Sequence, residues 1–418
     1  MKDILFSALS NLLNFLFSKG SMVAAGIVAS HLTSMENTQT LSIIIATISA
    51  FGTLFQQAVS TTNIRYNSQI ITKTKNYRTT VTIIISTLSL PVSLYLYVTS
   101  QLSAINSALI FILLILNGTS GFKLADATIQ KKFVHISILG TIQGALILLA
   151  TFTILKLELG TDFYTLPFLL ASALWFSIPS TQLSPSETST TVNTAISKTF
   201  LPAIFTGIFF LPVIWLLIGD IQARFGDQEA FLLTTANQWR MTVGILPAIF
   251  GGYLLLLLTK VGHKDKKNKN SNYTITYYPA VAITIACTAL VSHLDLIYPT
   301  EIANNTELKK TIILFMLASV ITTLKSSISR EMIAAELAKL SIASNLIWAT
   351  IFCTLHFFVY HQEGAYGVSK SFLASQVIHL LLWAPIIIKK ELIPKEFIDF
   401  KFLASIIPLA WILYANAT

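Results

Sequence analysis

The sequence has few charged residues and no shortage of apolar ones. Only 11% of the 418 residues are Asp, Glu, Lys or Arg, whereas 54% are hydrophobic and the mean hydropathy is +0.69. A soluble chain of this length could not bury so much apolar surface. The composition therefore predicts an all-α membrane protein that crosses the bilayer many times.

Cysteine and the common catalytic motifs are also scarce. The two cysteines, Cys287 and Cys353, fall in apolar segments, which argues against a disulfide framework or a metal cluster. The sequence has no H-x-x-E-H, C-x-x-C or Walker pattern and no loop long enough for a nucleotide-binding domain. We therefore expect no cofactor, no direct use of ATP and no nucleic-acid partner. The N-terminus lacks a clean cleavage site, so residues 5–30 are interpreted as a first span rather than a signal peptide.

Apolar runs of about 20 residues, the length that spans a bilayer as a helix, predict twelve transmembrane helices. They lie near residues 5–30, 39–64, 79–99, 105–122, 133–155, 163–183, 198–219, 229–259, 274–298, 310–330, 338–360 and 366–388. Twenty of the 28 Lys and Arg residues fall in the connections on one side. Only Lys156, Arg224, Lys309 and Lys310 fall on the other. The positive-inside rule then predicts that the N-terminus and the C-terminus are cytoplasmic.

A Ser/Thr-rich stretch divides the twelve segments into two sets of six. We predict an N-terminal lobe (1–183), a cytoplasmic linker (184–197), a C-terminal lobe (198–390) and a tail (391–418). The lobes show a weak internal likeness, and repeated halves around a central site are typical of transporters. The apolar part of the tail, residues 402–416, is short and contains Pro408, which favours an interfacial or re-entrant helix over a further span.

Four basic residues lie inside the predicted spans, namely Lys19, Arg240, Lys325 and Lys370, and the only carboxylate clearly inside one is Asp295. A charge near the bilayer centre costs about 2.5 kcal/mol or more, so these cations should face an aqueous cavity or a bound anion. Lys325 and Lys370 could instead extend to the nearer interface. Lys19 and Arg240 lie too deep to do so easily. The excess of cations predicts a positive cavity.

Amide side chains accompany these cations. The stretch "TTANQWRMTVGILP" carries Asn237 and Gln238 beside Arg240, and the second segment carries Gln56 and Gln57. These amides could contact substrate or only bond neighbouring helices together. Pro247, Gly251 and Gly252 make the eighth segment a candidate for a bend that moves.

Two histidines lie within predicted spans. His379 falls in the middle of the twelfth segment and His356 inside the eleventh. Either could relay protons, although a single histidine inside a membrane is more often a packed hydrogen-bonding residue.

A lysine lies in the middle of the predicted tenth helix (Lys325), followed by a polar turn and by Gly364 and Gly367 at the start of the last helix. With this pattern, Leu317–Trp348 followed by Gly364–Trp383 resembles the tenth-to-twelfth helix region of Wzx-type flippases, in the superfamily that also includes multidrug extruders and the lipid II flippase. Looser similarity covers the second helix and the "NQWR" helix. The branch resembled is the one that handles O-antigen and enterobacterial common antigen.

The resemblance implies a bacterial inner-membrane protein of lipopolysaccharide biosynthesis. Its substrate would be an undecaprenyl-diphosphate-linked oligosaccharide, moved from the cytoplasmic to the periplasmic leaflet by alternating access. Its partners would be membrane lipids and other glycan-assembly proteins, such as a polymerase and a chain-length regulator. Members often carry a Gly-Asp pair before the lysine, where this chain has Ile321 and Thr322. That departure leaves ion coupling open.

The residues suit such a substrate independently, because cations neutralise phosphate and amides bond sugar hydroxyls. A multidrug extruder of the same fold is the first alternative, but pumps for cationic drugs generally need buried carboxylates. A membrane-embedded O-antigen polymerase or ligase is a second, although no outer loop clearly exceeds about a dozen residues. A scaffold without transport activity would not explain the deep cations.

Overall fold

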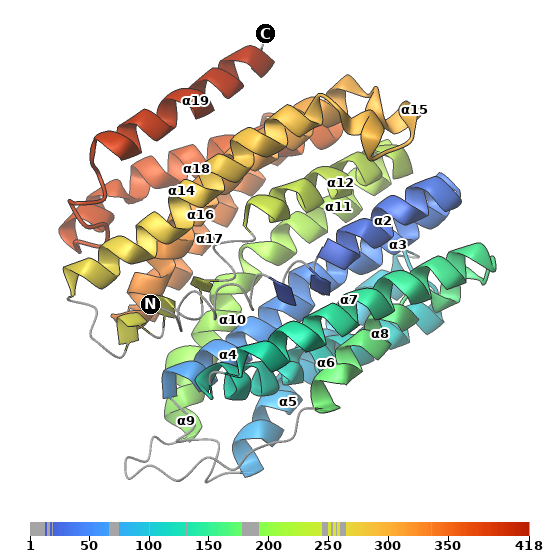
Figure 1. The fold of residues 1–418 in the computed structure, drawn as a ribbon, viewed down its shortest axis with the longest axis horizontal. Coiled ribbons are helices and arrows are strands. Elements are labelled where there is room, and N and C mark those ends of the chain that lie inside the picture. The colour runs from blue at the N-terminus through green and yellow to red at the C-terminus, as the bar shows by residue number, and fades with distance from the viewer. Residues whose placement is uncertain are drawn as a thin grey trace. The chain divides into compact units, whose positions relative to one another are not determined.

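A computed structural model describes residues 13–14, 17–18, 20–66, 75–99, 101–130, 132–177, 192–244, 250–251, 254–255, 257–259, 265–335 and 337–417. Over these ranges the chain forms helices joined by turns (Figure 1). Nine helical segments of the described part are long and apolar enough to cross a membrane. The three remaining predicted spans, 5–30, 163–183 and 229–259, each include residues outside the description. The predicted all-α polytopic class is confirmed.

Polar caps set where several of the long helices begin. Ser103 caps α6 (Ala104–Ile129) through its hydroxyl, which accepts from the Asn106 amide at 3.3 Å. Asn305 caps α16 (Thr306–Ala334), where its Oδ1 accepts from Leu308 N at 2.9 Å. Each cap satisfies an amide that the helix itself leaves unpaired. The apolar runs that follow then continue as helix because lipid offers the backbone no other partner.

The contacts divide the chain into two compact units, residues 1–215 and 216–418. The boundary lies inside α11 (Leu211–Phe225), near the end of the predicted seventh segment. Helix α9 (Val192–Ala195) already begins within the stretch predicted as linker. Residues 178–191 are not among the described residues, so the division into two lobes at 184–197 stays a prediction.

In the first unit, α6 packs against α4 (Thr53–Tyr66), α5 (Lys75–Val98) and α8 (Leu166–Ala173). Helix α7 (Phe133–Lys156) packs against α2 (Gly20–Leu32) and α8. Gly121 permits the close approach of α6 to α4, since a Cβ there would lie 2.5 Å from the Gln56 carbonyl oxygen. Small residues at such contacts are the usual way in which membrane helices approach closely.

The second predicted span is interrupted by one turn of π-helix. Helix α3 (Met35–Thr47) continues through η1 (Ile48–Gly52) into α4. The Trp215 indole donates to the Thr47 hydroxyl at 2.8 Å, and its ring packs on Phe51 at 5.1 Å. Single π-helical turns often lie near functional sites, because they change the direction of the side chains beyond them.

In the second unit, α16 packs against five other helices (Figure 1). They are α12 (Asp227–Val243), α14 (Lys266–Val291), α17 (Ala338–Phe358), α18 (Gly364–Lys389) and α19 (Phe400–Ala417). Buried aromatic rings pack between α16, α17 and α18, where Phe315, Trp348 and Phe352 surround Phe372. Helix α19 occupies the predicted tail, and its interfacial placement stays a prediction.

Candidate functional site

Three of the predicted site residues belong to the first unit. Lys19 lies outside the described residues. Gln56 donates from Nε2 to the Ser120 hydroxyl at 2.8 Å and so joins α4 to α6, whereas the neighbouring Gln57 is exposed. The contact of Gln56 is of the kind expected if it only holds helices together.

The second unit buries the other amides together with Arg240. Asn237, Gln238 and Arg240 are each less than a tenth exposed on α12. The Arg240 Nε donates to Asn237 Oδ1 at 2.7 Å, three residues away on the same helix. Its guanidinium also lies over the Phe372 ring of α18, 5.5 Å from the centroid. Asn237 thus orients Arg240 toward an aromatic face.

Lys325 reaches the same stretch of α18 from α16. Its Nζ donates to Gln376 Oε1 at 2.9 Å and lies 5.3 Å from the centre of the Trp348 ring. Among the described residues, no carboxylate lies within 4 Å of this ammonium. An amide oxygen and an aromatic face stabilise the charge without neutralising it.

These contacts bring Arg240 and Lys325 to one region of the second unit. Phe372 and Gln376 are four residues apart on α18 and therefore lie on one face, about 6 Å apart. The Trp348 and Phe372 rings also meet edge to face, with centroids 5.7 Å apart. We call Arg240, Lys325, Trp348, Phe372 and Gln376 the cation–aromatic cluster. It places two basic side chains over a pair of aromatic rings.

A small cavity opens beside Lys325 between α16, α17 and α18. Its polar lining includes Ser344, Asn345 and His379, and Trp383 lines it as well. The space open to the centre of a water molecule is about 20 Å³, enough for about one water. The His379 Nε2 lies 3.2 Å from the Ser344 hydroxyl, and its ring stacks on Trp383. His379 is therefore packed and hydrogen-bonded at the edge of this cavity.

Lys370 lies apart from that cluster, in the first two turns of α18. Its Nζ pairs with Glu363 Oε2 at 2.7 Å and lies 4.4 Å from the Tyr366 ring centroid. Both members of the ion pair are about one-third exposed. The expectation of a cation with scarcely any acidic partner is therefore wrong for Lys370, although a role in substrate contact stays a prediction.

A second buried set of charges was missed by the sequence analysis. Helix α16 continues to Ala334, and Arg330 and Glu331, which the predicted topology put at and beyond the end of the span, are buried. The Arg330 guanidinium donates to Asn272 Oδ1 at 2.7 Å and to the Ser327 hydroxyl at 2.9 Å. Glu331 accepts from Asn272 Nδ2 at 3.4 Å and lies 3.9 Å from the Lys269 Nζ.

The carboxylates that the structure buries differ from the one that the sequence predicted. Asp295 lies in the 3-10 turn Leu294–Leu296, after α14 has ended at Val291, so its placement inside a span was wrong. Glu331 is 1% exposed on α16, and Asp126 is 7% exposed on α6, where it pairs with Arg78 at 3.5 Å. The sequence does carry a signal for Glu331. Ile328 and Met332 are apolar and four residues apart, a spacing that continues the helix past residue 330, and both are buried in the structure.

The chain was compared with known families, curated proteins and solved structures. No family model matches it, and no curated protein matches it in sequence. Solved structures do match in fold. They include the lipid II flippase MurJ in an inward closed conformation, at 15% identity and a TM-score of 0.69 over 99% of this chain and 98% of that one.

Two further matches are transporters of the MOP superfamily. One is a multidrug resistance MATE family transporter in an outward-facing conformation, at 12% identity and a TM-score of 0.65 over 99% of this chain and 96% of that one. The other, from Pyrococcus furiosus, has a binding pocket of reverse polarity and matches at 12% identity and a TM-score of 0.65 over 92% and 95%. At these identities the likeness shows that the chain has a fold similar to that of these proteins, and no more.

Proposed function

We propose that this chain is a transporter that moves an undecaprenyl-diphosphate-linked oligosaccharide across a bacterial inner membrane, from the cytoplasmic to the periplasmic leaflet. The fold supports a transporter, since its structural matches include MurJ and MATE proteins. The observation that carries the choice of substrate is the cation–aromatic cluster, where Arg240 and Lys325 meet amide and aromatic partners.

The chemistry of that cluster suits a phosphorylated sugar lipid. A guanidinium and an ammonium can neutralise the oxygens of a diphosphate. The Trp348 and Phe372 rings are fully buried against the two cations and hold them in place, while Asn237 and Gln238 can bond sugar hydroxyls. The lipid tail stays in the bilayer throughout, so only the polar headgroup needs a protein-lined path.

The remaining predicted residues take supporting roles in this proposal. Lys19, Gln56 and Gln57 contribute to the path from the first unit, and Lys370 assists release near Glu363. Both termini lie in the cytoplasm, as the distribution of Lys and Arg favours. Alternating access between two lobes moves the headgroup from one side to the other.

A multidrug extruder is the second candidate, and two observations favour it. MATE transporters match the fold about as well as MurJ does. The buried carboxylates of Asp126 and Glu331 are also the kind of group that a cationic drug would need. Both carboxylates already have basic neighbours, Arg78 and Lys269 respectively, which is why the lipid diphosphate is preferred.

The test is deletion of the gene, followed by measurement of lipid-linked glycan in each leaflet. We expect the glycan to accumulate on the cytoplasmic side, with rescue by the wild type but not by Arg240→Ala or Lys325→Gln. Lys389→Gln, a change at an exposed lysine on α18, serves as the matched control and should rescue fully. Unchanged surface glycan in the deletion strain, or tight binding of cationic dyes with no response to lipid diphosphates, would contradict the proposal.

A further inference from the structure

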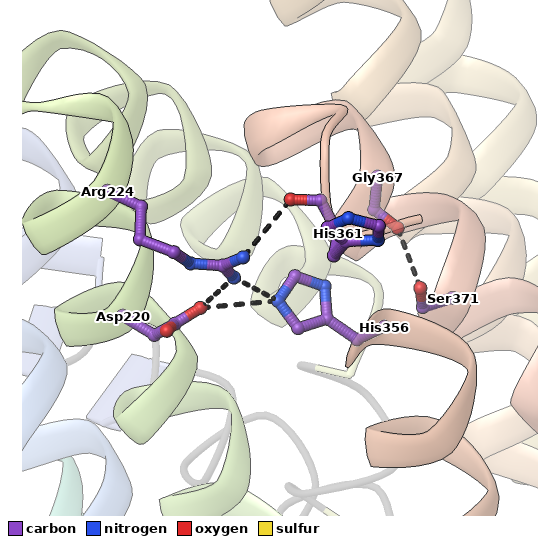
Figure 2. Close-up of polar contacts among 6 residues, drawn as sticks. All are labelled: Asp220, Arg224, His356, His361, Gly367 and Ser371. Atoms are coloured by element: carbon purple, nitrogen blue, oxygen red, sulfur yellow. Dashed lines mark hydrogen bonds and ion pairs between the residues drawn. The ribbon is translucent and has the colours of Figure 1, made fainter. Parts of the chain in front are cut away.

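Three ionisable side chains gather where α11 meets the end of α17 (Figure 2). Asp220 and Arg224 are one turn apart on α11 and form an ion pair. His356, near the end of α17, places its Nε2 3.0 Å from Arg224 Nη2 and 3.4 Å from Asp220 Oδ2. The histidine is fully buried, whereas the side chains of Asp220 and Arg224 are about 30% exposed.

The short contact with Arg224 fixes the protonation state of the ring. A guanidinium nitrogen can only donate a hydrogen bond, so His356 Nε2 must accept. The ring is then neutral, and its one proton is on Nδ1, which has no partner among the described residues. A neutral ring with a bare Nε2 can take up a proton on the side that faces Asp220.

Protonation is incompatible with the observed contact. Once Nε2 carries a proton it becomes a donor, and two donors cannot share a separation of 3.0 Å. The nearest acceptor is Asp220 Oδ2, which at present receives the Arg224 ion pair. A protonated His356 therefore donates to Asp220 and displaces Arg224 from the ring.

Arg224 also ties down the turn between α17 and α18. Its second terminal nitrogen, Nη1, donates to the His361 carbonyl at 3.1 Å, and Figure 2 shows the guanidinium bridging from Asp220 to this turn. The guanidinium further lies over the Phe357 ring, with 5.9 Å to its centroid. Movement of Arg224 away from His356 thus removes an anchor of the turn.

We propose that Asp220, Arg224 and His356 form a proton-binding site that controls how firmly α11 holds the α17–α18 turn. A proton from solvent reaches His356 Nε2 past the partly exposed Asp220. The N–H bond at Nε2 is the one covalent bond that forms, and none breaks within the protein. The ionisable groups that face His356 are Asp220 and Arg224 from α11 and His361 from the turn. From α18, Figure 2 shows Gly367 and Ser371, which are uncharged and bonded to each other at 2.8 Å. This site stands on its own geometry and holds for any transported substrate.

Hydrogen exchange of the purified protein tests this directly. We expect backbone amides of residues 357–363 to exchange about threefold to tenfold faster near pH 5.5 than near pH 8, after correction for intrinsic rates, because one anchoring bond is lost. His356→Gln should stay protected at both pH values, since a Gln oxygen accepts from Arg224 without titrating. His361→Gln is the matched control, because the backbone carbonyl that accepts from Arg224 is kept, and it should still respond to pH.

A second variant covers the case in which His356→Gln does not fold. Asp220→Asn removes the charged acceptor of the protonated ring, so the change in exchange should move to lower pH. The proposal is wrong if hydrogen exchange of the wild-type turn does not change with pH. It is also wrong if His356→Gln keeps this pH response or if His361→Gln abolishes it. An unchanged midpoint of the pH response in Asp220→Asn would contradict it as well.

Discussion

The two compact units bury different kinds of polar group. In the first unit, the described contacts deep between helices are mostly neutral, such as Gln56 to Ser120 and Ser172 to Asn117, and the ion pair of Asp126 includes a partly exposed Arg78. In the second unit, Arg240 and Arg330 are each 7% exposed and Glu331 is 1% exposed. Buried charge is expensive in a membrane and is seldom kept without a purpose.

The difference suggests that the two units contribute unequally to recognition of an anion. Neutral amides can hold helices together at little cost, whereas cations with amide partners retain a charge that can act on a ligand. Substitution of a buried cation in the second unit should therefore impair transport strongly. Substitution of a neutral amide that joins helices in the first unit should lower stability only slightly.

The largest effect should follow from removing the charge of Lys325. We expect Lys325→Gln to reduce translocation by about tenfold to a hundredfold, the worth of one charged hydrogen bond to phosphate. Gln143→Leu in the first unit, at a buried amide that donates to the Ala171 carbonyl at 2.7 Å, is the comparison and should retain most activity. The rates can be measured in vesicles containing each purified variant. Equal losses in both variants would remove the distinction between the units.

A second effect concerns stability. Lys269→Met leaves Glu331 buried and without the ammonium that lies 3.9 Å from it, so the free energy of unfolding should fall by about 3 kcal/mol. Arg78→Met breaks a partly exposed pair in the first unit and should cost about 1 kcal/mol or less. Denaturant unfolding in detergent compares them. The double variant with Glu331→Gln should recover part of the loss, and no recovery would mean that the pair is not coupled.

A smaller effect is expected at Lys370, because Glu363 already balances its charge. Lys370→Gln should slow translocation by about threefold, far less than Lys325→Gln, since an ion pair that is about one-third exposed is worth about 1 kcal/mol or less. The same vesicle assay measures it. A loss as large as that of Lys325→Gln would show that Lys370 belongs with the deep cations.

The smallest effect should come from Gln56. Loss of one interhelical hydrogen bond between neutral groups in a membrane costs about 0.6 kcal/mol, so Gln56→Leu should lower the free energy of unfolding by about that amount. Unfolding in detergent provides the measurement. A loss of several kcal/mol would mean that Gln56 contributes far more to the stability of the first unit than one neutral hydrogen bond.

The sequence predicted the fold class well, because hydropathy reports directly on bilayer spans. Nine of the predicted segments overlap helical segments in the described residues that are long and apolar enough to cross a membrane. Helix ends were less accurate. The predicted seventh and tenth segments stopped at 219 and 330, whereas α11 continues to Phe225 and α16 to Ala334. Charged residues at a helix end lower the hydropathy even when neighbouring helices bury them.

The site was predicted only in part for the same reason. Arg240 and Lys325 could be found because charges stand out within apolar runs. Their convergence on Phe372 and Gln376 could not, because it depends on how α12 and α16 pack against α18. The partnership of Asp220 with His356 spans 136 residues and leaves no local pattern.

We propose that the deep cations of the second unit receive a lipid-linked diphosphate. The most direct measurement is the transbilayer movement of undecaprenyl diphosphate carrying one fluorescent sugar, in vesicles with purified wild type, Lys325→Gln or Lys389→Gln. We expect fast movement with the wild type and with Lys389→Gln and little with Lys325→Gln. Movement of a cationic dye by all three proteins, with the diphosphate lipid left in its original leaflet, would contradict the claim.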